Sequence, residues 1–412
     1  MKFRMRIAIV SKADSYGGGA SKCAQELTSL LQRKGISATH FCAWSGIGYN
    51  NNRLPLYGRF QKTGLRVHYV SKRLGLPELL PFEILTFIRR KRYKQYDLFH
   101  FHDLSSAISP YTLLLLSRFR PVVWTIHDCS PFTAGCLYPM ECEKFMATCT
   151  DCPQIGEWPL DNQFVFTKYL QKIKKKIHEN GNIRCITPSD WMADTAIKAS
   201  VVSRRPKVIN NGVNVDTYRF HDKIRVKKEL GVPVDKTSIL LSAGNLDDSR
   251  KGVEYALKGL YSIQDKNPHV LLMGVPSPKL ERQLNGLGLT FTSFGYVSDP
   301  IELSRRYAAA DFFLFCSLAD NQPLAVLEAL ASGTPVIGFA TGGVPELIEQ
   351  NETGFLVPPK DIHALSKALS FAVDEAPLYD WSMSAREAAV TNFSCERFVN
   401  EHIQLYGQIH CN

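Results

Sequence analysis

Short runs of β-branched and aromatic residues alternate with helical patterns along the whole chain. In the first half we predict strands at Ile7 to Val10, Leu98 to His102, Val122 to Ile126 and Arg184 to Thr187. In the second half the same pattern predicts strands at Lys207 to Ile209, Ser238 to Ser242, Val270 to Met273, Phe312 to Phe315 and Pro335 to Phe339. This rhythm is typical of parallel strands covered by helices. The sequence therefore predicts an α/β protein with two parallel-sheet domains.

The length also favours two domains, because 412 residues exceed the roughly 250–300 that one hydrophobic core supports. A helical pattern ends near Ser200, and a break at Pro206 precedes the next strand. We predict one domain over residues 1–205 and a second over 206–382, with a ligand cleft between them. Residues 383–412 have a helical pattern and are expected to pack back across the boundary.

No apolar run approaches the roughly 18 residues that a membrane span needs. After the basic start of the chain, the apolar run from Ile7 to Val10 is shorter than the core of a signal peptide. We therefore expect a cytoplasmic protein.

The charge is divided unequally between the two halves. Up to Pro206 there are 30 Lys and Arg against 15 Asp and Glu, and beyond it 19 against 24, so the halves carry +15 and −5. The basic residues gather at Arg89 to Lys94 and Lys168 to Lys176. Such groups favour an anionic partner, although solvated helix faces are the alternative. We predict a membrane surface and no nucleic acid, because no nucleic-acid-binding motif accompanies the charge.

Two glycine-rich loops follow predicted strands and precede helices. Gly17, Gly18 and Gly19 follow the first strand, and Gly342 and Gly343 precede a helix that starts at a proline. Backbone N–H groups in such loops can approach an anion at the positive end of a helix, although a plain tight turn is the alternative. Neither the dinucleotide GxGxxG spacing nor a P-loop lysine is present at the first loop.

Charged residues follow two strands of the second half. Arg250 and Lys251 could neutralise a diphosphate, with a basic surface loop as the alternative. Pro323 starts a helix, so Asp320 is expected in the loop ahead of it and Glu328 on the helix. A carboxylate there can accept two hydrogen bonds from a ribose diol. The alternative is a capping Asp and a surface Glu.

Four cysteines in one loop-rich segment have the spacing C-x5-C-x6-C-x2-C. They are Cys136, Cys142, Cys149 and Cys152. Four thiolates can form a tetrahedral structural zinc site, and such a site leaves no open position for catalysis. Disulfides and unligated thiols are the alternatives.

Taken in order, these motifs resemble those of glycosyltransferase family 4, a group of retaining nucleotide-sugar transferases with the GT-B fold. The matching residues are Gly17 to Ala20, His127-Asp128, Asn211 to Asn214, Arg250 to Gly252, Asp320 to Glu328 and Gly342 to Glu346. Residues 125–132, followed by the Cys-rich insertion at about 129–160, are similar to the bacterial exopolysaccharide and O-antigen (colanic-acid-like) subset. The resemblance implies two Rossmann-like domains facing each other across a cleft, the first for the acceptor and the second for the nucleotide sugar.

The resemblance also implies roles for individual residues. Glu328 would bind the ribose hydroxyls, Lys251 and Arg250 the diphosphate, and His127 would face the donor sugar. The implied donor-binding set is Gly17, Gly18, Gly19, Asn245, Asn321, Gln322, Pro323, Leu324 and Glu328, and the implied catalytic set is Asp320, Glu328, His127, Lys251 and Arg250. His127 could instead be a buried structural histidine.

The sequence departs from the family pattern at two positions. Asp320 stands where the E-x7-E motif has its first Glu, and Asn245 stands where an Arg commonly follows the strand. Arg250 is expected to substitute for that missing Arg. The implied mechanism is front-face substitution with retention, without a catalytic cofactor or metal, because positive charge on the diphosphate stabilises the leaving group.

The resemblance implies transfer of a hexose to a polyprenyl-diphosphate-linked glycan, at the inner face of the bacterial inner membrane. UDP is favoured over GDP as the donor nucleotide. One alternative is a nucleotide-sugar epimerase of the same fold. Another, from a different class, is a zinc-stabilised nucleic-acid-binding protein built on the basic half.

Overall fold

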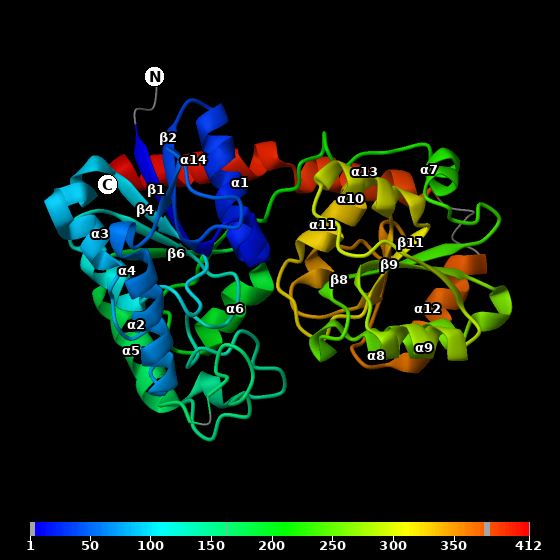
Figure 1. Cartoon of the computed structure of the whole chain (residues 1–412), viewed down its shortest axis with the longest axis horizontal. Helices are drawn as coiled ribbons and strands as arrows, with labels where there is room; N and C mark the ends of the chain where they lie inside the picture. Colours follow the sequence, from blue (N-terminus) through cyan, green and yellow to red (C-terminus); the bar gives the residue numbers. More distant parts are fainter. Residues whose placement is uncertain (1–4, 163, 375–379, 412) are drawn as a thin grey trace. The chain divides into compact units, whose positions relative to one another are not determined.

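The computed structural model describes residues 5–162, 164–374 and 380–411. The chain forms two compact units: unit 1 comprises residues 1–210 and 399–412, and unit 2 comprises residues 211–398. Figure 1 labels the elements of both units. The predicted boundary lay after residue 205, and the division in the structure follows Asn210.

Unit 1 is built on a seven-stranded parallel sheet with the order β3-β2-β1-β4-β5-β6-β7. Its strands are β1 (Arg6–Ala13), β2 (Ser37–Trp44), β3 (Arg53–Pro55), β4 (Leu98–Phe101), β5 (Val122–Thr125), β6 (Ile183–Thr187) and β7 (Lys207–Val208). Its helices are α1 (Gly19–Arg33), α2 (Gln61–Arg73), α3 (Ile84–Ile88), α4 (Pro110–Ser117), α5 (Thr167–Asn180) and α6 (Asp190–Lys198), joined by the later residues of α14 (Cys395–Cys411).

All residues of β4 and β5 are buried, as expected for strands of a parallel sheet covered on both faces. Successive side chains of β4 point to opposite faces. Phe99 joins the core formed with α3 and α4, whereas His100 contacts Tyr406 of α14.

Unit 2 contains a six-stranded parallel sheet with the order β10-β9-β8-β11-β12-β13. Its strands are β8 (Ser238–Asn245), β9 (His269–Val275), β10 (Thr290–Ser293), β11 (Phe312–Phe315), β12 (Val336–Phe339) and β13 (Gly354–Val357). Its helices are α7 (Lys223–Glu229), α8 (Val253–Tyr261), α9 (Pro278–Gly286), α10 (Pro300–Ala309), α11 (Leu324–Ala331), α12 (Ile362–Asp374) and α13 (Trp381–Asn392), and α14 begins in this unit.

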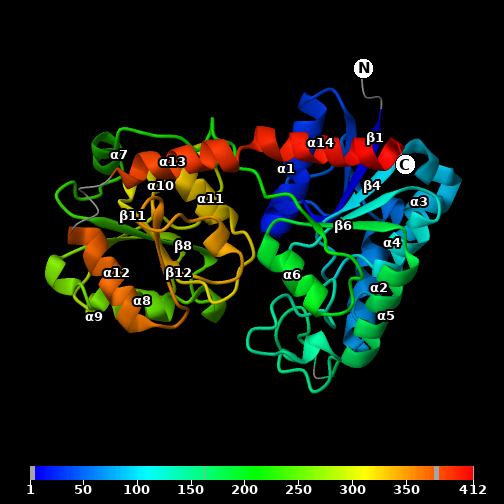
Figure 2. The ribbon, with the colours of Figure 1, turned by 180° about the vertical axis from the view of Figure 1, so that it is seen from behind.

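The two faces of this sheet carry separate cores. Leu240 of β8 packs with α7, α10, α11 and α13, whereas its neighbours Ile239 and Leu241 pack with α8, α9 and α12. Figure 2 shows the two helix layers on either side of the sheet. Successive side chains of β8 point to opposite faces, and both faces are covered by helices, which explains why the sequence of this strand contains a continuous apolar run.

The structure confirms two parallel-sheet domains and corrects one strand. The segment Lys207 to Ile209 was predicted to open the second domain, but β7 pairs with β6 in the sheet of unit 1. The N–H of Ile209 extends this ladder to the carbonyl of Thr187. Four strands were missed: β2, β3, β10 and β13.

The end of the chain is helical, with α13 in unit 2 and α14 passing from unit 2 to unit 1. Within the residues that the structure describes, no helix is both long and apolar enough to cross a membrane.

Both sheets share one feature that positions a site. In each, the first strand of the unit lies between its second and fourth strands, so the chain order reverses between β1 and β4 and between β8 and β11. Ligands of open α/β sheets bind at the carboxyl ends of the strands beside this point. The loops that follow these four strands are therefore the places to look for functional side chains.

Candidate functional site

In unit 2, the loop after β8 meets the loop after β11 at the reversal of strand order. The first loop leads to the short 3-10 helix η5 (Ser249–Lys251), and the second carries Ser317 and Asp320. Leu318 donates its backbone N–H to the carbonyl of Arg250 at 2.8 Å, which joins the two loops. The basic and acidic residues predicted separately from sequence therefore form one cluster.

Gly252 permits this close approach. Its φ is +66°, and a Cβ atom added there would lie 1.9 Å from the carbonyl oxygen of Cys316. Any larger side chain would push the two loops apart or force a left-handed backbone that L residues rarely adopt. The glycine after Lys251 is thus required by the geometry of the cluster.

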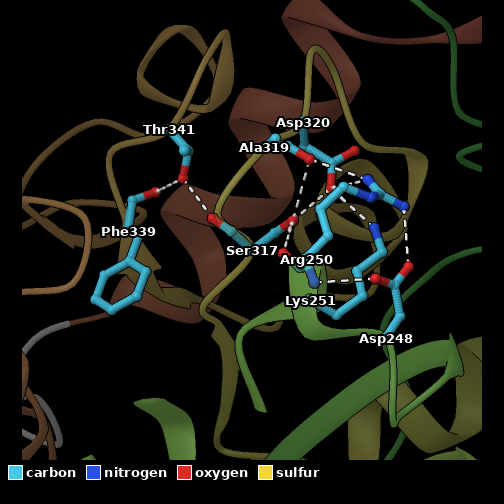
Figure 3. A network of polar contacts seen from close by, with 8 residues as sticks. All are labelled: Asp248, Arg250, Lys251, Ser317, Ala319, Asp320, Phe339 and Thr341. Atoms are coloured by element: carbon cyan, nitrogen blue, oxygen red, sulfur yellow. Dashed lines mark hydrogen bonds and ion pairs between the residues drawn. The ribbon is translucent and has the colours of Figure 1, made fainter. Parts of the chain in front are cut away.

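Asp320 is the centre of the polar network drawn in Figure 3. Its Oδ2 atom lies 2.9 Å from Lys251 Nζ and 3.8 Å from a terminal nitrogen of Arg250, and it accepts a hydrogen bond from Ser317 Oγ at 2.8 Å. Thr341, after β12, donates its hydroxyl to the carbonyl of Ser317 at 2.6 Å. Loops after three strands thereby fix the position of one carboxylate.

Arg250 is held by contacts on both of its sides. Its guanidinium donates to the carbonyl of Ala319 at 3.0 Å and lies 3.3 Å from Asp248 Oδ2. The other oxygen of Asp248 accepts the backbone N–H of Arg250 at 2.9 Å. Both cations of the cluster are therefore oriented before any ligand is present.

The charges of this cluster are coupled. Burial alone would raise the pKa of Asp320, but Lys251 and Arg250 hold it below its usual value, with help from the Ser317 hydroxyl. The carboxylate is therefore ionised at neutral pH. Within the described residues, Lys251 Nζ makes one hydrogen bond, to Asp320. Two of its three N–H donors remain for an anion such as a phosphate.

Glu328 lies on α11 and is buried, with 7% of its surface exposed. Its Oε2 atom accepts a hydrogen bond from Tyr307 of α10 at 3.3 Å. A buried carboxylate on a helix at this edge of the sheet is not the surface glutamate that was the alternative from sequence.

The loop before α11 is fixed from a second direction by Asn211. The N–H of Asn211 donates to Gln322 Oε1 at 2.5 Å, and its side-chain amide donates to the carbonyl of Gln322 at 3.1 Å. Gln322 Nε2 is buried and has no partner among the described residues. A buried donor without a partner is costly, and a bound ligand would supply the acceptor.

The remaining donor-binding candidates of unit 2 lie at the same loops. Asn321 is buried, Pro323 occupies the N-cap of α11, and Leu324 is its first residue. Asn245 ends β8, where its side-chain oxygen accepts the N–H of Asp247 at 3.0 Å. This oxygen therefore closes a local turn.

In unit 1, the predicted glycine loop follows β1 and opens α1. Gly18 has a φ of +98° and is the N-cap of α1, while a Cβ on Gly17 would lie 2.3 Å from that of Ala13. Gly19 is the first residue of the helix. The preceding Asp14 accepts from the N–H of Tyr16 and from Ser45 Oγ, which ties the loop down.

His127 follows β5 and contacts a histidine that follows β4. His127 Nε2 lies 2.9 Å from His102 Nδ1, and the two rings stack with centroids 5.2 Å apart. Burial lowers the pKa of His127 to about 4, so the ring is neutral at physiological pH. His100 continues the group, with hydrogen bonds to Tyr406 and Thr125 at 2.6 Å each.

Carboxylates lie in the same region of unit 1. Asp103 pairs with Lys12 at 2.9 Å, and Asp128 accepts the N–H of Ser130 at 2.8 Å. Burial, followed by the charge of Asp103, raises the pKa of Asp128 to about 6.

The cysteine segment packs as a small core on α5 and α6. Cys149 joins this core with Phe132 and Phe145, and burial raises the pKa of Cys136 to about 12 and of Cys149 to about 11. Within the described residues, no group of three or more His, Cys, Asp or Glu side chains is arranged to hold a metal ion. The zinc site at Cys136, Cys142, Cys149 and Cys152 stays a prediction.

One member of the basic runs is not on the surface. Lys174 of α5 is buried and donates to the carbonyl of Ser130 at 2.7 Å. Lys172, Lys175 and Lys176 of the same helix are exposed. Helical spacing explains the difference, since Lys174 lies on the face with Leu170 and Ile177.

Two family models match the chain. Residues 17–217 match the model described as Glycosyltransferase Family 4, and residues 237–375 match the model Glycosyl transferases group 1. The two matched segments follow one another along the chain and together span most of it. Arg250, Lys251, Asp320 and Glu328 lie within the segment matched by the group 1 model, and His127 lies within the segment matched by the family 4 model.

Curated relatives are similar over much of the chain. The chain is 26% identical to sulfoquinovosyl transferase SQD2 of Arabidopsis thaliana, over 72% of the chain and 60% of the relative. It is 27% identical to D-inositol 3-phosphate glycosyltransferase of Corynebacterium glutamicum, over 58% and 62%. The chain thus spans about three fifths of these two relatives. It is 24% identical to the putative colanic acid biosynthesis glycosyl transferase WcaC of Escherichia coli, over 70% and 68%.

Solved structures have the same fold. Sucrose-phosphate synthase from Thermosynechococcus elongatus superposes with a TM-score of 0.72 at 20% identity, over 99% of this chain and 100% of that one. Anabaena HepE in complex with UDP superposes with a TM-score of 0.69 at 18% identity, over 98% and 100%. With two Rossmann-like parallel sheets, the protein has the α/β GT-B fold.

One residue of the clusters, Ser317, was not singled out from sequence, and the contacts of three other residues were not predicted. Ser317 and Thr341 hold Asp320, Asn211 holds Gln322, and His102 contacts His127. His102 was predicted as the end of a strand, and Asn211 as part of the motif Asn211 to Asn214. Ser317 follows β11 by two residues, as Thr341 follows β12, and this position after a strand is the signal that could have found it.

Proposed function

We propose that the protein is a retaining, metal-independent glycosyltransferase that transfers a hexose from a nucleotide-diphosphate sugar. The observation that carries the proposal is the pair of cations, Arg250 and Lys251, held by Asp320 at the strand-order reversal of unit 2. Oriented positive charge stabilises a departing diphosphate without rearrangement during the reaction. Buried Glu328 would accept the ribose hydroxyls, and the free amide donor of Gln322 would bind the sugar or phosphate.

UDP is the nucleotide that we propose, because the HepE structure contains UDP at a similar fold. The acceptor that we propose is a polyprenyl-diphosphate-linked glycan in surface polysaccharide assembly. The name of the relative WcaC supports this pathway. We place the protein at the inner face of the bacterial inner membrane, where the basic surface of unit 1 would contact anionic lipid. The epimerase and nucleic-acid alternatives gain no support from the matched models, since both describe glycosyltransferases.

Nucleotide binding can be tested by thermal unfolding with UDP-, GDP-, dTDP- and ADP-sugars. A ligand at 100 times its Kd stabilises the native state by about 2.7 kcal/mol. We expect one nucleotide series to stabilise the wild type, and Lys251→Ala and Glu328→Gln to abolish the effect. Lys258→Ala is the matched control, because Lys258 is an exposed lysine of unit 2 that pairs with Glu254.

Transfer itself requires a product assay. The stabilising sugar nucleotide is incubated with a polyprenyl-diphosphate-linked glycan, and the anomeric configuration of the product is read by NMR. We expect a glycosidic bond with the configuration of the donor. Stabilisation by no nucleotide sugar in a folded sample would refute the proposal, and an inverted product would refute retention.

A further inference from the structure

Unit 1 contains a cavity of about 460 Å³ that shares no residue with the candidate site. It is lined by the short 3-10 helix η2 (Gly58–Phe60), by α3 and by the 3-10 segment η3 (Arg89–Gln95). A cavity of this size is within the range of small-molecule sites.

Four arginines line this cavity: Arg59, Arg89, Arg90 and Arg92. No acidic residue is among the lining residues, and none of the four forms an ion pair with a carboxylate in the part of the chain that the structure describes. Arg92 lies over the ring of Phe41 at 5.1 Å, and Arg59 over that of Phe60 at 4.8 Å. Stacking restricts the guanidinium planes, which lowers the entropy that each loses on binding an anion.

The nearby carboxylates do not neutralise these arginines. Residues 56–95 contain two acidic side chains, Glu78 and Glu83, and both are buried. Glu83 accepts from the N–H of Ser109 at 2.7 Å and lies 3.1 Å from His68. Glu78 accepts from the N–H of Ser106 at 2.8 Å. The cavity therefore has a positive charge that the surrounding protein leaves uncompensated.

The backbone of η3 has an unusual conformation at the cavity. Arg90 and Lys91 have φ angles of 52° and 53°, in the left-handed region that costs a non-glycine residue about 1–2 kcal/mol. A regular helix would turn successive side chains by about 100° to different faces. The interruption instead lets Arg89, Arg90 and Arg92 line the same cavity.

Apolar side chains are exposed beside the guanidinium groups. Phe60 is 40% exposed, Leu85 is 44% exposed, and the neighbouring Ile88 is 43% exposed. Phe60 and Leu85 line the cavity itself. A soluble inorganic phosphate has no apolar part that could contact these residues, whereas a lipid carries a phosphate directly above an apolar chain.

We propose that this cavity binds the phosphate headgroup of an anionic membrane lipid. Arg59, Arg89 and Arg90 would hold the phosphate, and Phe60 and Leu85 would contact the first carbons of the lipid chain. This cavity would be the lipid-binding site in the membrane association proposed above, and the proposal rests on that association. It does not depend on which sugar is transferred.

The test is sedimentation of the full chain with vesicles of phosphatidylcholine alone or with phosphatidylglycerol. The cavity variant is Arg59→Gln/Arg89→Gln/Arg90→Gln, and the matched control is Lys172→Gln/Lys175→Gln/Lys176→Gln on the exposed face of α5. We expect the cavity variant to bind phosphatidylglycerol vesicles at least about tenfold more weakly and the control less than about threefold. Equal losses of vesicle binding in the two variants would overturn the proposed cavity site and would indicate binding through the basic surface in general. Absence of wild-type binding would overturn the membrane association as well.

A second experiment distinguishes a lipid headgroup from soluble phosphate as the ligand of the cavity. Phe60→Ser/Leu85→Ser should weaken binding to phosphatidylglycerol vesicles by about threefold or more, because it removes apolar contact and no charge. Inorganic phosphate at about 10 mM should leave more than half of the protein on the vesicles at constant ionic strength. Full displacement by phosphate together with unchanged binding of the apolar variant would identify a soluble phosphate site and overturn the proposal.

Discussion

Lys251 Nζ lies 2.9 Å from Asp320 Oδ2, although the two residues follow different strands and are 69 positions apart in the chain. The hydroxyl of Ser317 donates a hydrogen bond to the same Oδ2 atom at 2.8 Å. Asp320 therefore faces the cations of the cluster. We interpret it as a residue that positions Lys251 and Arg250, which is a role open to a side chain shorter than the Glu of the family pattern.

Asp320→Asn should lower kcat more than it lowers nucleotide affinity. The amide cannot hold the ammonium of Lys251 as a carboxylate does, and a hydrogen bond to a charged group contributes about 1.5–3 kcal/mol, or about 10–150-fold in rate. The Kd of the stabilising nucleotide should stay within about fivefold, because the cations remain. Kinetics and calorimetry measure the two quantities, and a loss of affinity as large as the loss of kcat would show direct contact with the nucleotide instead.

Gly252→Ala should destabilise unit 2 by about 1–3 kcal/mol and abolish nucleotide stabilisation. The added Cβ would collide with the carbonyl oxygen of Cys316 and displace Lys251. Gly244→Ala is the control near the end of β8, since no atom lies within 4 Å of a Cβ at that position. Urea unfolding with and without nucleotide measures both effects, and similar behaviour of the two variants would contradict the role of Gly252.

His102→Phe should reduce kcat by roughly three- to tenfold, the effect of losing one neutral hydrogen bond. Phenylalanine keeps the stacking on His127 but cannot bond to its Nε2 atom. His102→Asn can restore that bond and should recover most of the rate. The pH dependence of kcat gives a second measure, because a more hydrated His127 would have a pKa above about 4. An unchanged profile and rate would exclude the positioning role.

Asp128→Asn should make the protein more stable at pH 7 than the wild type. The folded pKa of Asp128, about 6, lies above its ordinary value, so this group lowers the free energy of unfolding as pH rises from about 4 to about 6. The decrease in the free energy of unfolding is complete above that pH range and, for a half-buried group, amounts to about 1–2 kcal/mol. Asparagine keeps the acceptor for the N–H of Ser130 and has no such pH dependence. Urea unfolding at pH 4 and pH 7 tests the difference, which should vanish at pH 4.

The fold could be predicted from sequence where strands are buried on both faces. Phe312 to Phe315 is apolar throughout because helices cover both sides of β11, and the prediction of this strand was correct. The missed strands include β10, which lies at a sheet edge, is half exposed and has the sequence TFTS. Strand β7 was recognised but assigned to the wrong sheet, because its pairing with β6 depends on a tertiary contact.

The candidate site was predictable as a set of charged and glycine-rich loops, but not as a network. Sequence placed Arg250, Lys251 and Asp320 after strands, and the order of strands then brought β8 beside β11. The contacts of Ser317 and Asn211 depend on atoms that meet only in the folded unit. The buried position of Lys174 followed from helical spacing, which the count of basic residues did not consider.

Unit 2 is an insertion within unit 1, because the chain leaves unit 1 after Asn210 and returns at Val399. Its two ends are neighbours: the N–H of Val213 donates to the carbonyl of Phe393 at 2.8 Å, and the N–H of Cys395 donates to the carbonyl of Val213 at 3.0 Å. Hydrogen bonds thus join the two ends of a fragment of residues 211–398, whereas a fragment of residues 1–210 lacks Tyr406, one of the two hydrogen-bond partners of His100. Unit 1 is therefore completed only after unit 2 has been synthesised.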